Sequence, residues 1–170
     1  MTSRRRLIVM RHAKAEPFAA TDHERVLTER GRRDAVEAGL HLAATGVVPD
    51  YAVVSSAART VATWEAVALG SRSTAEVVLD DAVYTGSPDV VLEVLRVVPL
   101  DAQVLIFVGH NPTAAYVAHL LDDGTGDPTA TREMLKGYPA NAMAVLELEV
   151  PWSDLGPETG RLIDFHVARA

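Results

Sequence analysis

Short, largely apolar runs of four or five residues recur along the chain, and a segment of helical character follows each of the first four. These runs cover residues 7–10, 51–54, 75–79 and 104–108. A strand that is covered by helices on both faces has no solvated side, so it reads as a nearly continuous apolar run. The repeated strand-helix order therefore predicts an α/β protein with a mainly parallel central sheet.

Capping residues mark the ends of the intervening helices. Thr28 is the candidate N-cap of the first helix and Gly46 its candidate C-cap, while Gly70 is expected to close the second helix. Ser87 and Pro88 are typical of a helix start, with a capping hydroxyl followed by proline at the first helical position. The helices expected on this basis cover residues 28–45, 57–69, 87–98 and 112–121.

The last quarter of the chain predicts two further strands, residues 142–150 and 161–167, after a loop rich in Asp, Gly and Thr. The segment 151–160 between them is interpreted as a long surface hairpin. With 170 residues the chain is long enough to bury a core unaided. We therefore expect one domain, residues 1–170, built as a three-layer sandwich in which helices flank the sheet.

Composition narrows the range of partners. A net charge of −7 disfavours nucleic acid or an anionic membrane as the main partner, but a locally basic pocket can still bind a small anion. The chain contains no cysteine, which excludes disulfides, thiolate catalysis and cysteine-ligated zinc. The apolar run near the start is too short for a secretory signal or a membrane span. We expect a cytoplasmic protein.

Charged residues follow three of the predicted strands directly. Arg11 and His12 come after the first strand, Arg59 opens the helix after the second, and His110 follows the strand at 104–108. The carboxyl ends of parallel strands meet at one edge of a sheet, where ligands bind. Guanidinium groups beside helix N-termini suit a phosphoryl group, although a carboxylate also fits. Taken singly, each arginine reads as a surface residue; taken together, they predict an anion site.

A histidine in such a place can act as a general base, a metal ligand or a nucleophile. Neighbouring arginines repel a cation, and the chain has no H-x-H or H-E-x-x-H spacing, so a metal site is disfavoured. Nucleophilic attack on phosphorus fits better. The remaining histidines are interpreted as structural or surface residues, with His23 and His166 lacking partners. Glu16 and Asp22 are left undecided as residues of the entrance.

The motifs "RHAKAE", "SSAART" and "GHNP" together resemble those of the histidine phosphatase (phosphoglycerate-mutase-like) superfamily. The stretch "TDHERVLTERGRRDA" resembles its short phosphohistidine phosphatase branch, the SixA-like proteins. The resemblance implies that His12 becomes transiently phosphorylated and that Arg11, Arg59 and His110 bind the phosphoryl oxygens. It implies no metal and no organic cofactor.

Four positions qualify this resemblance. Ala13 stands where the superfamily usually has glycine, so its methyl group either crowds the substrate or is tolerated. Lys14 adds a cation that we expect at the pocket rim, and we count it with Asn111 among the substrate-binding residues. The candidate general acid is Asp81, because larger relatives carry a glutamate beyond the third strand. A phosphohistidine needs less help from an acid than an alkyl phosphate does, since its imidazole leaves easily.

The sequence thus predicts a phosphatase that acts through a phosphohistidine intermediate, with a phosphorylated protein as its partner. One alternative is a phosphatase of small metabolites such as sugar phosphates or nucleotides, which needs a working acid. An alternative of another class is a non-catalytic module that binds phosphate or phosphohistidine. The oligomeric state is not predicted.

Overall fold

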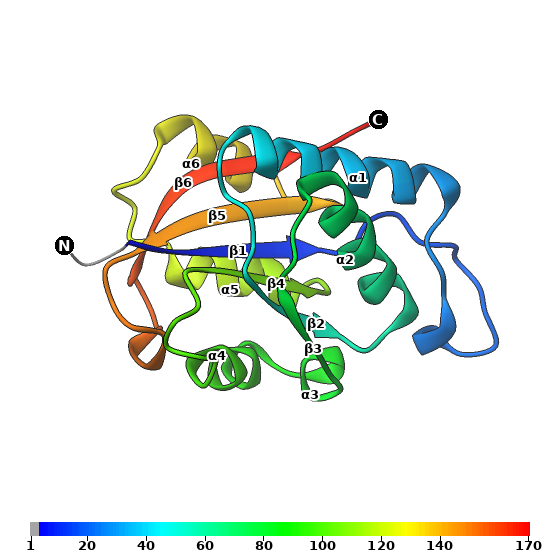
Figure 1. Cartoon of the computed structure of the whole chain (residues 1–170), viewed down its shortest axis with the longest axis horizontal. Helices are drawn as coiled ribbons and strands as arrows, with labels where there is room; N and C mark the ends of the chain where they lie inside the picture. Colours follow the sequence, from blue (N-terminus) through cyan, green and yellow to red (C-terminus); the bar gives the residue numbers. More distant parts are fainter. Residues whose placement is uncertain (1–3) are drawn as a thin grey trace.

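The computed structural model describes residues 4–170 and contains one sheet of six strands in the order β3-β2-β4-β1-β5-β6 (Figure 1). The strands β3, β2, β4 and β1 are mutually parallel, and β5 runs antiparallel to both β1 and β6. The expectation of a mainly parallel sheet is confirmed. The strands are β1 (Arg5–Arg11), β2 (Tyr51–Ser55), β3 (Glu76–Asp80), β4 (Val104–Gly109), β5 (Ala142–Leu148) and β6 (Gly160–Val167).

Helices cover both faces of this sheet. The helices α1 and α2 pack on one face, and the others contribute side chains to the core on the opposite face. The helices are α1 (Glu29–Ala44), α2 (Ala58–Ser71), α3 (Ala82–Thr85), α4 (Pro88–Arg96), α5 (Thr113–Leu121) and α6 (Pro128–Leu135), with 3₁₀ turns η1 (Asp22–Glu24) and η2 (Trp152–Asp154). This is the predicted three-layer α/β sandwich.

The first strand explains why the apolar runs of the inner strands lack alternation, whereas β3, at the edge of the sheet, is largely exposed. Leu7 and Val9 point into the core beneath α4 and α5, whereas Ile8 and Met10 point into the core beneath α1 and α2. Successive side chains of a strand point to opposite faces, and both faces are buried here. The strand is therefore held rigidly between two hydrophobic layers, and its carboxyl end is a fixed mounting point.

Two predictions about the second and later elements were wrong. Gly70 does not close α2, which continues to Ser71 and ends where Arg72 adopts a left-handed conformation with φ of 57°. The loop expected after α5 contains the helix α6, whose N-cap Asp127 accepts a hydrogen bond from Ala130 N–H. The sequence of this short helix has no apolar periodicity, because only two of its residues are buried.

The connection between β5 and β6 is a hairpin, as expected, but its interior is not on the surface. Trp152 is fully buried in the core beneath α4 and donates its indole N–H to Ala102 O at 2.9 Å. The turn η2 thus closes one end of the core. No helix within residues 4–170 is long and apolar enough to cross a membrane.

Glycines let α1 and α2 approach closely. A Cβ on Gly39 would lie 2.2 Å from Val67 O, and one on Gly70 would lie 2.1 Å from Val36 O. Both contacts are with backbone atoms, which cannot rotate away. The two helices therefore depend on glycine at their crossing, and this is why Gly70 lies inside α2.

We expect Gly70→Ala to lower the free energy of unfolding by about 1–2 kcal/mol, because an overpacking cost of about 3 kcal/mol, the upper end of the usual range for a contact with backbone, outweighs the gain of about 1 kcal/mol in helix propensity. Urea denaturation measures the change. Gly156→Ala is the matched control, since a Cβ there meets no atom closer than 3.7 Å. An equal effect of the two substitutions would contradict this account of the crossing.

Candidate active site

The carboxyl ends of β1, β2 and β4 lie at one edge of the sheet. Arg11 ends β1 and is paired with Gly109 at the end of β4, and His12 extends the ladder by donating its N–H to Gly109 O at 3.0 Å. The ring centroids of His12 and His110 lie 5.4 Å apart. Arg59 is the second residue of α2, which follows β2. The structure thus brings together the four residues predicted from the strand ends.

The backbone that follows the first histidine is held from two helices. Ala13 N–H donates to Thr63 Oγ1 of α2 at 3.0 Å. Lys14 O accepts from the backbone N–H and the hydroxyl of Thr28, the N-cap of α1, at 2.9 and 3.2 Å. A Cβ on Gly31 would lie 2.1 Å from Lys14 O, so only glycine permits this approach. The stretch "LTERG" therefore positions the loop that carries the histidine.

His12 is held in one tautomer. Its Nδ1 lies 2.7 Å from Ala13 O, and a carbonyl oxygen only accepts, so Nδ1 carries the hydrogen and Nε2 carries the lone pair. No hydrogen bond within residues 4–170 involves this Nε2. Burial, opposed by the bond to Ala13 and assisted by the charges of Arg59 and Arg11, lowers the pKa of His12 to about 4. The ring is therefore neutral and nucleophilic near pH 7.

His110 presents a hydrogen-bond donor. Its Nε2 lies 2.7 Å from Ser55 Oγ, and that oxygen accepts from Ala57 N–H at 3.5 Å. The Ser55 hydroxyl can donate to Nε2, and in that tautomer the ring hydrogen is on Nδ1. Burial, followed by the charge of Arg59, lowers the pKa of His110 to about 3. The ring stays neutral and offers Nδ1–H.

Asp22 orients the guanidinium of Arg59. Its backbone oxygen accepts from Arg59 Nη1 at 2.8 Å, and its Oδ2 accepts from Nη2 at 3.0 Å and from the Tyr84 hydroxyl at 2.6 Å. Arg25 donates to Oδ1 at 3.0 Å. The bonds from Tyr84 and Arg25, and then from Arg59, lower the pKa of Asp22 well below its usual value. Asp22 is therefore an ionised acceptor and cannot supply a proton.

Tyr138 anchors Arg11 from the other side. Its carbonyl accepts from Arg11 Nη1 at 3.1 Å and from Asn111 Nδ2 at 2.7 Å, and its hydroxyl donates to Val9 O at 2.5 Å. Asn111 Oδ1 also accepts from Ala115 N–H at 3.3 Å. Both ends of the Asn111 amide, which we expected to bind substrate, thus have partners within the protein.

Three donors of the cluster are buried and have no hydrogen-bond partner within residues 4–170. They are Arg11 Nε, Arg59 Nε and His110 Nδ1. Arg5 and Arg6 also carry such an Nε, so one alone is not diagnostic. Three around one neutral histidine, however, match an anion with several oxygen atoms.

The side chains of Lys14 and Asp81 are not bonded to this cluster. Lys14 is exposed in a different hollow, and Asp81 is exposed at the N-terminus of α3 without a side-chain hydrogen bond. Within the described residues neither side chain has a hydrogen bond or ion pair with the four central residues. Substrate binding by Lys14 and acid catalysis by Asp81 therefore remain predictions without a supporting contact. The methyl group of Ala13 is fully buried in the core beneath α1 and α2.

Sequence reasoning missed residues whose contacts depend on loop geometry. Tyr84 and Tyr138 belong to none of the motifs, and Ser55, although it begins "SSAART", was assigned no role. His23 and His166 were wrongly expected to lack partners. The His23 Nε2 lies 3.0 Å from Ser56 Oγ with its ring edge-on to Tyr84, and His166 stacks on His41 at 3.8 Å.

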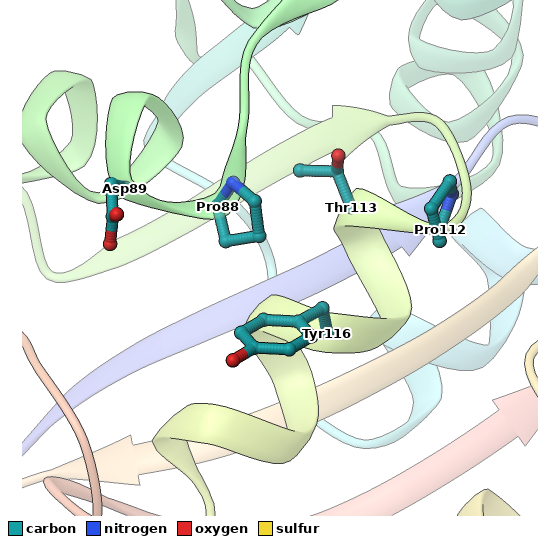
Figure 2. Close-up of a pocket in the computed structure, with 5 residues that line it drawn as sticks. All are labelled: Pro88, Asp89, Pro112, Thr113 and Tyr116. Atoms are coloured by element: carbon teal, nitrogen blue, oxygen red, sulfur yellow. The ribbon is translucent and has the colours of Figure 1, made fainter.

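A second hollow lies between α4 and α5, with a volume of about 300 Å³ (Figure 2). Its lining residues are Pro88, Asp89, Pro112, Thr113 and Tyr116. Figure 2 shows the Tyr116 ring beneath Pro88 and Thr113, on the same side of α5. The only charge in this lining is the Asp89 carboxylate, so the hollow offers nothing to a phosphoryl group.

Several known proteins are similar to this chain over most of its length. An uncharacterized protein of Mycobacterium tuberculosis strain H37Rv is 33% identical over 162 residues, which span 94% of this chain and 100% of the relative. A candidate phosphohistidine phosphatase SixA of Nakamurella multipartitia is 33% identical, with a TM-score of 0.86 over 98% of each chain. A candidate SixA of Agrobacterium tumefaciens is 27% identical, with a TM-score of 0.78 over 95% of this chain and 97% of that one. No protein-family model matches.

A sheet of this topology with paired histidines and arginines at its strand ends defines an enzyme of the histidine phosphatase type. Within that class the similarity is specific. The chain belongs to the histidine phosphatase superfamily, in its SixA-like branch.

The lowered pKa values predict how the two histidines titrate. We expect the ring NMR signals of His12 and His110 to stay constant from pH 8 to 5.5. The unfolded chain binds protons below about pH 6.5 and the folded rings do not, so the free energy of unfolding falls as the pH drops from 6.5 towards 4. A ring midpoint near 6.5 for either histidine would contradict the buried, cationic environment.

Proposed function

We propose that residues 1–170 act as one catalytic domain that hydrolyses phosphohistidine in a protein, through a covalent phosphohistidine on His12. The observation that carries this proposal is the set of three buried, unpartnered N–H groups around a neutral imidazole. A phosphoryl group has three peripheral oxygens, and Arg11, Arg59 and His110, whose charges or ring lie close to His12, offer N–H groups to them. The neutral ring supplies the nucleophile.

In the first step His12 Nε2 forms a bond to phosphorus as the P–N bond of the substrate breaks. The leaving imidazole nitrogen takes the electron pair of that bond and a proton from solvent. Arg11, Arg59 and His110 stabilise the charge on the equatorial oxygens. The Ala13 carbonyl accepts from Nδ1–H throughout and so stabilises the positive charge that the phosphorylated ring acquires.

In the second step a water oxygen attacks phosphorus, and the bond to His12 Nε2 breaks. The electron pair returns to Nε2, orthophosphate leaves, and the water proton passes to phosphate or solvent. The same donors serve both transfers because the phosphorus stays between them. The scheme uses no group outside this chain, the substrate and water.

The state of the carboxylates favours a phosphoramidate over an alkyl phosphate. Asp22 is the carboxylate bonded to the cluster, and its lowered pKa keeps it ionised; Asp81 is exposed and unbonded. An alkoxide leaving group without a positioned acid loses about 10²–10⁴-fold in rate, whereas imidazole leaves readily. The names of the SixA-type neighbours, which describe phosphohistidine phosphatases, support the same substrate class.

We expect turnover of a phosphohistidine peptide to exceed that of sugar phosphates and nucleotides by at least about 100-fold in kcat/KM, because no acid assists the latter.

His12→Ala should abolish turnover and still bind inorganic phosphate. Arg59→Ala should weaken phosphate binding about 10- to 100-fold, the loss of one charge-assisted contact. Phosphate release and isothermal calorimetry measure these quantities.

Arg32→Ala is the control, because Arg32 is exposed on α1 and has no hydrogen bond or ion pair with the four central residues. Comparable rates on sugar phosphates would favour a metabolite phosphatase. Phosphate binding without turnover of any of these substrates would favour a binding module, and unchanged affinity in Arg59→Ala would remove that residue from the site.

A further inference from the structure

Another hollow, of about 390 Å³, lies beside the candidate active site, and we propose that it docks acidic side chains of the phosphohistidine protein. We call it the basic hollow; its lining residues are Lys14, Arg30, Asp34, Pro139, Ala140 and Arg169. The inference rests on the proposed function and adds a determinant of substrate choice outside the phosphoryl cluster.

The basic hollow shares a wall with the active site. Pro139 and Ala140 lie between Tyr138, whose carbonyl anchors Arg11, and Asn141, whose N–H donates to His12 O at 3.0 Å. Lys14 follows His12 by two residues, so their Cα atoms are at most about 7–8 Å apart. An acidic group in the hollow can therefore belong to the same molecule as the phosphoryl group on His12.

Hydrogen bonds between distant segments hold the walls of the hollow in place. Asn141 is fully buried and donates Nδ2 to Asp34 O of α1 and to Ala168 O, each at 3.0 Å. Arg169 Nη1 donates to Ala140 O at 3.2 Å and to Ala168 O at 2.9 Å. These bonds tie three distant segments together and fix one guanidinium at the rim.

Positive charge is in excess here. Lys14 makes no side-chain hydrogen bond within the described residues, and Arg30 approaches Asp34 only to 3.9 Å. Asp34, the single acid of the lining, is buried, and its Oδ1 accepts from Ala170 N–H at 2.8 Å. Among the side chains of the lining there are thus three cations and one carboxylate, in a chain whose net charge is −7.

The opposite end of the sheet has the reverse charge. A hollow there is lined by four acids and one arginine, namely Asp123, Glu147, Glu149, Glu158 and Arg161, with neutral residues between them. Glu147 and Glu149 flank Leu148, which pairs with Arg5 at the start of β1, whereas His12 follows the end of β1. Glu147 is paired with Arg4 and with Arg161, and the other three acids would repel an acidic partner at this end.

Exposed cations suit carboxylates of a protein better than a second phosphate of a metabolite. No donor of Lys14, Arg30 or Arg169 is buried without a partner, in contrast to the three donors around His12. Solvated cations at a rim give weak, wet contacts that act by number and position. Carboxylates one or two helical turns from a phosphohistidine lie about 5–11 Å from it, which matches the reach of this rim.

Two phosphohistidine peptides test the proposal, one with glutamates four residues before and after the phosphohistidine and one with glutamines there. We expect the wild-type protein to show a KM several-fold lower for the glutamate peptide at low salt, and the difference to vanish near 1 M salt. Arg30→Gln and Arg169→Gln should each raise that KM about two- to fivefold and leave the glutamine peptide unchanged. Arg32→Gln, on the same helix as Arg30, is the matched control.

The affinities of His12→Ala for the same two peptides, measured by fluorescence anisotropy, test the preference without turnover. The salt dependence tests it in a protein whose hollow carries no substitution. Equal binding of the two peptides, or an equal effect of Arg32→Gln, would overturn the docking site. Stronger competition by a small bisphosphate than by the glutamate peptide would assign the hollow to a metabolite and also overturn it. If the protein hydrolyses phosphoramidate and both peptides but does not prefer the glutamate peptide, only the docking site is overturned. If it hydrolyses neither phosphoramidate nor either peptide, the proposed function is overturned.

Discussion

The hydrogen bond from His12 Nδ1 to the carbonyl of Ala13 is the interaction on which the site depends. It selects the tautomer that leaves Nε2 unprotonated, and it works only if the backbone after β1 cannot move. The core beneath α1 and α2 buries the side chain of Ala13, Thr63 bonds its N–H, and Thr28 bonds the next carbonyl. The two helices, which pack closely against each other at their glycines, thereby fix the orientation of the His12 imidazole.

The cations around this imidazole perform two tasks with one arrangement. Their charge, added to burial, keeps His12 and His110 neutral, and one buried N–H group of each arginine has no hydrogen-bond partner within residues 4–170. Asp22 limits the cost of burying Arg59, because a buried charge without a partner is strongly destabilising. Because Asp22 is thereby fixed as an anion, the contact that stabilises Arg59 also makes this carboxylate unable to act as an acid.

The sequence allowed prediction of the features that depend on periodicity and chain order. Buried parallel strands read as apolar runs, and the carboxyl ends of three of them located Arg11, His12, Arg59 and His110. Contacts between loops have no such signature, so Tyr138 and Tyr84 were not identified, and the buried Trp152 was placed on the surface. The helix α6 was missed for a related reason, because a short helix with two buried residues has almost no periodic pattern.

Trapping the phosphorylated enzyme tests the central claim most directly. The protein is mixed with a phosphohistidine peptide labelled with ³²P and quenched in alkaline detergent within the first turnover, and the label is located by mass spectrometry. The account predicts one acid-labile, alkali-stable phosphoryl group on His12 Nε2 that is absent from His12→Ala. Label on another residue, or none in a preparation that is turning over substrate, would contradict it.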